Sequence, residues 1–162
     1  MGLITRSTPG RIVLLAVVLL VGTIGGAAVV SAVRTGNEGC TPGFWKNHTE
    51  AWEEYAPDQL ISSVFSFDAG VYTDLAGDTL LEALNYPETQ NGSPQQILLK
   101  AAVAAILNAA SEEIGYPLRR FGDPGNIIPT VNALLTSGDE QAMLDFKDIL
   151  DDANNLGAEF CG

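Results

Sequence analysis

The sequence has little of several residue types, and each shortage excludes a class of site. Its 162 residues include one histidine and two cysteines, too few for a structural zinc site or an iron–sulfur cluster. Eight residues are Lys or Arg and 20 are Asp or Glu, so the net charge is −12. Nucleic-acid binding needs a basic surface, and we expect no such partner. The sequence contains no Gly-rich phosphate loop and no nucleophile-elbow pattern, and we expect no cofactor.

The N-terminal segment combines a basic start with a long uncharged run. Arg6 and Arg11 precede the run from Ile12 to Val33. As a helix the run would span about 33 Å, enough for a hydrocarbon core of about 30 Å. As a signal peptide it has a basic n-region, an apolar h-region and a possible cleavage site at Val30-Ser31-Ala32. The glycines in its second half favour the signal peptide, because they weaken a helix.

Both interpretations predict the same destination for the rest of the chain. Residues 1–32 would engage the export machinery and the membrane, as a signal peptide or as an anchor. Residues 33–39 would form a linker, and residues 40–162 an exported helical domain. The protein is then extracellular or at the cell surface, and membrane-anchored if the leader is not cleaved. The acidity of the exported part has three explanations that stay open: a salty habitat, calcium or a cationic partner, and plain solubility.

Export would also give the two cysteines a role. Cys40 opens the exported part and Cys161 nearly closes it, so in an oxidising compartment they would most simply pair. Closing a loop of about 120 residues stabilises a fold by about 4–5 kcal/mol in the chain-entropy model. The alternative is two free buried thiols. Asn47 and Asn91 each begin a triplet that matches the N-glycosylation acceptor pattern, the second weakened by the following Pro94.

The exported part reads as helix, turn, helix, with no sustained strand alternation. Ser93-Pro94-Gln95-Gln96 is a strong helix start, and the almost uncharged run that follows predicts a buried central helix over 94–110. Shorter helices are predicted at 49–55, 59–65 and 79–85, and a longer one from Asp123 or Asn126 to about 135. The capping box Ser137-Gly138-Asp139-Glu140 predicts a last helix, which ends before Gly157. The fold class is therefore a small all-α domain closed at its ends by a disulfide and preceded by an apolar leader.

The segment from Gly39 to His48 is the most distinctive motif. Pro42-Gly43 suits the centre of a type II turn, because glycine supplies the positive φ that this turn requires. Phe44 and Trp45 would then plug the domain beside the disulfide. In a second interpretation Phe44, Trp45, Lys46 and His48 form a binding surface for a glycan or a partner protein.

The run Cys-Thr-Pro-Gly-Phe-Trp-Lys-Asn-His, residues 40–48, resembles the signature that opens a family of small secreted prokaryotic domains. Residues 79–84 and 102–109 are similar to later segments of that family, as are Tyr116-Pro117 and the closing Cys161. The resemblance covers most of 39–162. It departs at Asn91-Gly92-Ser93, where relatives are expected to carry a Gly-rich run. It implies export, a terminal clasp and a surface or matrix role, and it implies no reaction.

Three weaker chemical hypotheses rest on the single imidazole and on the acidic residues. His48 lacks a recognisable nucleophile to activate, and a packing role near Trp52 is the simpler interpretation. Pairs of neighbouring glutamates could act as acid and base on a polysaccharide: Glu53-Glu54 and Glu112-Glu113. Four aspartates share one face of the last predicted helix and are calcium candidates, although a solvated face is the simpler interpretation: Asp145, Asp148, Asp151 and Asp152.

The sequence thus predicts a non-catalytic exported domain of the cell surface or extracellular matrix. It would act by assembly with itself or by binding other envelope components. Two alternatives remain open: an extracellular carboxylate-dependent polysaccharide hydrolase, and a calcium-dependent binding module.

Overall fold

The computed structural model describes residues 36–68, 71–88, 91–121 and 126–162. These residues all lie within one compact unit, Ala32–Gly162. The two interpretations of residues 1–32, and the first part of the predicted linker, concern positions outside the described residues.

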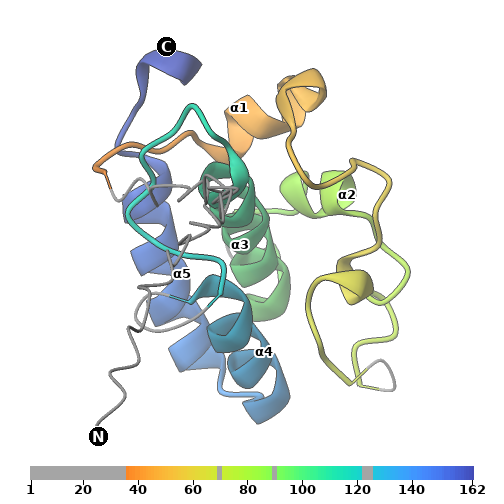
Figure 1. Cartoon of the computed structure of the whole chain (residues 1–162). Helices are drawn as coiled ribbons and strands as arrows, with labels where there is room; N and C mark the ends of the chain where they lie inside the picture. Colours follow the sequence, from red (N-terminus) through yellow and green to blue (C-terminus); the bar gives the residue numbers. More distant parts are fainter. Residues whose placement is uncertain (1–35, 69–70, 89–90, 122–125) are drawn as a thin grey trace, which may run out of the picture. The chain divides into compact units, whose positions relative to one another are not determined.

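The described chain is mostly helical. Five α-helices follow in order, together with three short 3₁₀ turns: α1 (Pro42–Asn47), α2 (Leu80–Leu84), α3 (Pro94–Ala110), α4 (Ile127–Ser137), α5 (Glu140–Asn154), and the turns Thr49–Ala51, Ile61–Ser63 and Glu159–Cys161. Figure 1 shows α3 in the middle of this arrangement, with α5 running along one side of it. Extended pairing within the described residues is limited to isolated bridges. The all-α prediction is confirmed for this part of the chain.

The central helix α3 forms where its local signals placed it. The Ser93 hydroxyl accepts a hydrogen bond from the Gln96 N–H, the Gln96 side chain accepts one from the Ser93 N–H, and Pro94 occupies the first turn. Most of the helix from Leu98 onward is fully buried, and α3 contacts each of the other four helices. Its alanines leave room for those neighbours to approach closely. Among the described residues, no helix has the length and apolarity needed to cross a membrane.

Two predictions for the segment from Pro42 to Tyr55 are wrong. Pro42-Gly43 does not form a type II turn but begins α1, because the Thr41 hydroxyl caps the Phe44 N–H at 3.1 Å and Pro42 suits the first helical position. The helix predicted at 49–55 is reduced to the 3₁₀ turn Thr49–Ala51, since the backbone leaves helical geometry at His48 and again at Trp52.

The remaining boundaries differ in smaller ways. The helix predicted at 59–65 is only the 3₁₀ turn Ile61–Ser63. Helix α4 begins after Asn126, one of the two predicted starts, and continues to Ser137, where Gly138 ends it at a φ of 69°. The predicted capping box at Ser137 is wrong, because Ser137 is the last residue of α4 and its hydroxyl donates to the Leu134 carbonyl. Asp139 caps α5 instead, by accepting a hydrogen bond from the Ala142 N–H at 3.0 Å.

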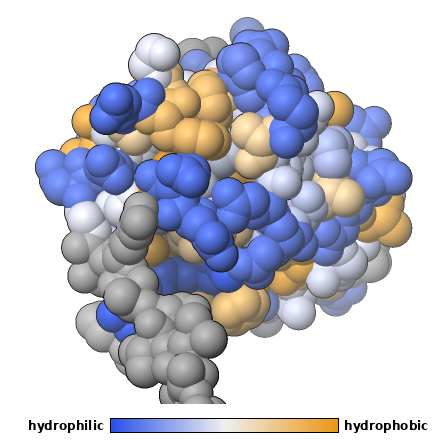
Figure 2. Space-filling model, turned by 45° about the horizontal axis from the view of Figure 1, so that its top comes forward, coloured by the Kyte–Doolittle hydropathy of each residue, from blue (hydrophilic) through white to orange (hydrophobic). Residues whose placement is uncertain are grey.

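The surface is largely hydrophilic. Figure 2 shows polar residues over most of one face, with apolar residues in separate patches between them. This agrees with the composition, in which acids outnumber bases by more than two to one.

Candidate functional site: the disulfide-clamped end

The two ends of the described domain are joined covalently. Cys40 and Cys161 form a disulfide with a Cα–Cα distance of 5.8 Å, closing a sequence separation of 121 residues. The chain just before Cys40 is also held, because the Gly39 N–H donates to the Gly157 carbonyl and Glu38 accepts from the Gly115 N–H at 2.7 Å. The predicted pairing is confirmed, and the alternative of two free thiols is wrong.

Helix α1 turns its two aromatic residues to different environments beside this disulfide. Trp45 is fully buried, whereas Phe44 is only partly buried. The two rings meet edge to face at 5.2 Å, and Phe160, next to Cys161, lies 5.6 Å from Phe44. Phe44 and Trp45 therefore pack beside the disulfide, as expected. Because Trp45 has no exposed surface, it cannot form part of a binding face.

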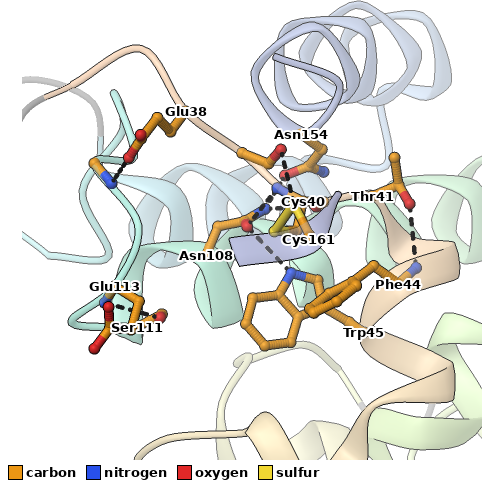
Figure 3. Close-up of a disulfide and its surroundings, with 12 residues drawn as sticks. Glu38, Cys40, Thr41, Phe44, Trp45, Asn108, Ser111, Glu113, Asn154 and Cys161 are labelled. Carbon is orange, nitrogen blue, oxygen red and sulfur yellow. Dashed lines mark hydrogen bonds between the residues drawn. A yellow bond between two sulfur atoms is a disulfide. The ribbon is translucent and has the colours of Figure 1, made fainter. Parts of the chain in front are cut away.

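A buried asparagine of α3 holds the motif in place (Figure 3). The Asn108 Oδ1 accepts hydrogen bonds from the Cys40 N–H at 2.7 Å and from the Trp45 indole N–H at 3.2 Å. Its amide nitrogen donates to the Cys40 carbonyl at 2.8 Å and to the Asn154 Oδ1 at 2.9 Å. Asn108 is fully buried, and these four hydrogen bonds use both acceptor positions of its oxygen and both N–H groups of its amide.

A second buried asparagine extends this network to α5. The Asn154 amide nitrogen donates to the Ala101 carbonyl at 3.0 Å, and its Oδ1 also accepts from the Tyr116 hydroxyl at 2.7 Å. Burial raises the pKa of Tyr116, which stays a neutral hydrogen-bond donor at any physiological pH. Together Asn108 and Asn154 tie α1, α3, α5 and the loop at Tyr116 into one polar network, which we call the asparagine network.

Sequence reasoning missed the asparagine network. The one available signal was a polar residue in an apolar run, Asn108 near the end of α3. Asn154 lies on α5 and gave no such signal. Neither residue's partners are close in sequence, since Cys40 lies 68 positions from Asn108 and Asn154 lies 46 positions away.

The polar residues of the motif lie on its outer side. Lys46, Asn47 and His48 are exposed. The His48 ring stacks on Phe44 at 4.5 Å, and its Nδ1 lies 3.1 Å from a carboxylate oxygen of Glu50. His48 thus packs on Phe44. Asn47 donates to the Gly43 carbonyl at 2.8 Å, and Asn91 is exposed, so both glycosylation candidates are at the surface.

Two of the four glutamates considered for catalysis, Glu53 and Glu54, have structural partners, whereas Glu112 and Glu113 are exposed. Glu54 forms two hydrogen bonds with Arg120, at 2.5 and 2.9 Å, and Arg120 lowers the pKa of Glu54 below its usual range. Glu53 accepts from the Ser111 hydroxyl at 3.4 Å and from the Glu112 N–H at 3.1 Å, just after the end of α3.

The aspartates of α5 are spread along its surface. Asp145 accepts a hydrogen bond from Gln141, while Asp148 and Asp151 share the Lys147 ammonium at 2.8 and 2.9 Å. Asp152 is exposed. Within the described ranges, no group of three or more His, Cys, Asp or Glu side chains is placed to hold a metal ion.

Comparisons of the chain with protein-family models, curated proteins and solved structures find no match. The resemblance of residues 40–48 to a secreted prokaryotic family therefore stays a prediction. The function has to be inferred from the chain's own geometry.

Proposed function

We propose that the protein is an exported, non-catalytic domain of the cell surface or extracellular matrix, acting by assembly or by binding other envelope components. The observation that carries this proposal is the Cys40–Cys161 disulfide, which joins the two ends of the domain. Disulfides of this structural kind persist in oxidising compartments and are rare in a reducing cytosol. The apolar run in residues 12–33 supports the same destination.

The partners of Glu53 and Glu54 favour binding over polysaccharide hydrolysis by this pair. A glycosidase needs one carboxylic acid with a raised pKa to protonate the leaving group. Arg120 shifts the pKa of Glu54 in the opposite direction. Glu53 is occupied by the hydrogen bonds at the end of α3. Both side chains therefore have a structural role in the fold, and the pKa of Glu54 is shifted away from that of a general acid.

The α5 aspartates likewise favour a solvated surface over a calcium site. Calcium is bound by six to eight converging oxygens. Asp148 and Asp151 instead face a shared ammonium, and the positive charge of Lys147 opposes a second cation at that position.

The outer side of α1 is the surface to which we assign the binding role. Lys46 and His48 are exposed there beside the partly buried Phe44, and the disulfide and the asparagine network fix the helix beneath them. A rigid support lowers the entropy that is lost when a surface is bound.

The location is tested by the intact mass of the native product, taken separately from the medium, the membrane fraction and the cytosol. Free thiols are alkylated before reduction and the remaining ones after it. We expect a product outside the cytosol whose cysteines react only after reduction. A cytosolic product with two freely alkylated cysteines would overturn the proposal.

The binding role is tested with purified protein by sedimentation velocity and by co-sedimentation with isolated envelope. We expect self-association or envelope binding that Lys46→Glu weakens. The matched control is Arg119→Glu, an identical charge reversal at an exposed position away from α1. Protein that stays monomeric and leaves the envelope fraction unbound would contradict the binding role.

A further inference from the structure

Two of the three lysines of this acidic chain line the same pocket. The sequence contains three, Lys46, Lys100 and Lys147. Lys100 and Lys147 line a pocket of about 430 Å³ between α1, α3 and α5. This volume falls within the range of about 300–1,000 Å³ that small-molecule sites occupy. The pKa of Glu88, which also lines the pocket, is lowered by its hydrogen bond to Lys100 and by the charges of Lys46 and Lys147. Two ammonium groups, those of Lys100 and Lys147, therefore lie at the pocket.

Lys100 supplies a fixed positive charge in the pocket wall. It projects from the middle of α3 and only 9% of the residue is exposed. Its ammonium donates to the Tyr86 carbonyl at 3.0 Å and to Glu88 at 2.7 Å. A lysine ammonium has three N–H donors, so one remains for a ligand. The Glu88 side chain is 72% exposed, and the third N–H of Lys100 can bind a ligand anion while Glu88 stays beside the ammonium.

Lys147 supplies a second positive charge from α5. Its side chain is 24% exposed and its ammonium contacts Asp148 and Asp151. The Asp148 side chain is 73% exposed, whereas that of Asp151 is 32% exposed and lines the pocket. The pattern repeats that of Lys100: the ammonium is held in the wall, and one of its carboxylate partners lies in solvent.

The other groups of the pocket select what an anionic ligand must carry. Glu88 and Asp151 offer acceptor oxygens, Thr41 offers a hydroxyl, and Ile97 adds an apolar wall. Both carboxylates are already paired with lysine, so a ligand ammonium would find neither of them unneutralised. Ligand hydroxyls can still donate to their remaining lone pairs. The complementary ligand has one acidic group, several hydroxyls and an apolar C–H face.

We propose that this pocket binds an acidic monosaccharide unit, with its carboxylate or phosphate on Lys100 and Lys147 and its hydroxyls on Glu88 and Asp151. The inference goes beyond the proposed envelope role and does not depend on it, because the pocket has the same chemistry wherever the protein resides. Failure to find the protein outside the cytosol would leave this binding test unchanged.

The test is isothermal titration calorimetry of the purified protein at low salt, with D-glucuronate and D-glucose 6-phosphate as probes. We expect saturable binding of at least one of them with a Kd below about 1 mM. D-glucose lacks the acidic group, L-glutamate carries an ammonium in place of the hydroxyls, and inorganic phosphate lacks a sugar ring. The proposal is overturned if neither acidic sugar binds, or if glucose, glutamate or phosphate binds as tightly as they do.

Variants decide whether the binding belongs to this pocket. Lys147→Gln removes one wall ammonium and is expected to weaken the affinity about tenfold or more, as for loss of a charge-assisted hydrogen bond. Arg119→Gln removes the same charge outside the pocket and is expected to change it less than about twofold. Equal effects of the two substitutions would show a general charge effect and overturn the site. Circular dichroism melting of both variants confirms that they are folded.

Discussion

Replacing Asn108 with leucine should destabilise the protein more than any substitution of an exposed polar residue. Leucine is close to asparagine in size, so the change removes hydrogen bonds without opening a large cavity. The Cys40 N–H, the Cys40 carbonyl and the Trp45 indole N–H then lose the partners that they have at 2.7, 2.8 and 3.2 Å. The Asn154 Oδ1 keeps its bond from Tyr116.

The size of the effect follows from these three groups. Each buried polar group left without a partner costs about 1–3 kcal/mol. Burial of the leucine side chain returns about 1.5–3 kcal/mol, and the clamped segment can relax toward water. We therefore expect a net loss of about 3–5 kcal/mol, a large fraction of the 5–15 kcal/mol that stabilises a typical domain.

The assay is urea unfolding of the oxidised protein, followed by fluorescence of Trp45 and Trp52. With an m-value of about 2 kcal/mol/M, the midpoint should fall by about 2 M. The matched control is Asn85→Leu, the same change at an exposed asparagine that donates to the Leu81 carbonyl at 2.9 Å. It should cost less than about 1 kcal/mol. An Asn108→Leu loss below about 1 kcal/mol, or one equal to the control, would refute the assignment of the asparagine network as a principal stabilising element.

Three further predictions concern the disulfide and the ion pairs. Cys161→Ala, or reduction of the native protein, should lower the free energy of unfolding by about 4–5 kcal/mol in the chain-entropy model. An unchanged urea midpoint on reduction would contradict a stabilising role of the disulfide. Arg120→Gln should cost up to about 1 kcal/mol, because Glu54 is more than half exposed, while Arg119→Gln should be neutral within about 0.5 kcal/mol in the same assay. The pKa values of Glu54 and Glu88 are lowered from 4.5 in the folded state. The two carboxylates therefore stabilise the folded protein fully above about pH 4.5, and this contribution is lost as the pH falls through their pKa values in the folded state. Melting temperatures measured between pH 3 and 7 should decline at the acid end, and the decline should be less steep in Glu54→Gln.

Helix α3 could be predicted from sequence because its determinants are local. The Ser93 cap, Pro94 and Gln96 lie within four consecutive positions, and the apolar run that follows them requires burial whatever its neighbours are. The pairing of Cys40 with Cys161 was predictable for another reason. A chain with two cysteines allows only one intramolecular disulfide.

Helix α1 was missed because its sequence suits two local structures. Proline favours both the second position of a type II turn and the first turn of a helix. The observed helix places the Trp45 indole within 3.2 Å of Asn108 and buries it completely, a tertiary contact that no local pattern reports. The hydrogen bonds of Asn108 and the gathering of Lys100 and Lys147 around one pocket could not be predicted for the same reason, since each joins distant segments.

The position of Asn108 on α3 suggests why a costly buried amide is present at all. An alanine-rich helix that is buried on nearly every side presents similar small side chains in several orientations. Packing alone therefore defines its rotation and its register against its neighbours poorly. A buried polar side chain defines both, because only one placement satisfies it, as a single buried asparagine does in coiled coils. Here Asn108 sets α3 against Cys40 and Trp45, while Asn154 sets α5 against the Ala101 carbonyl. The disulfide keeps the chain ends together, but a single covalent link leaves the helices free to rotate. The asparagine network, more than the disulfide, therefore specifies how α1, α3 and α5 meet around the pocket that Lys100 and Lys147 line.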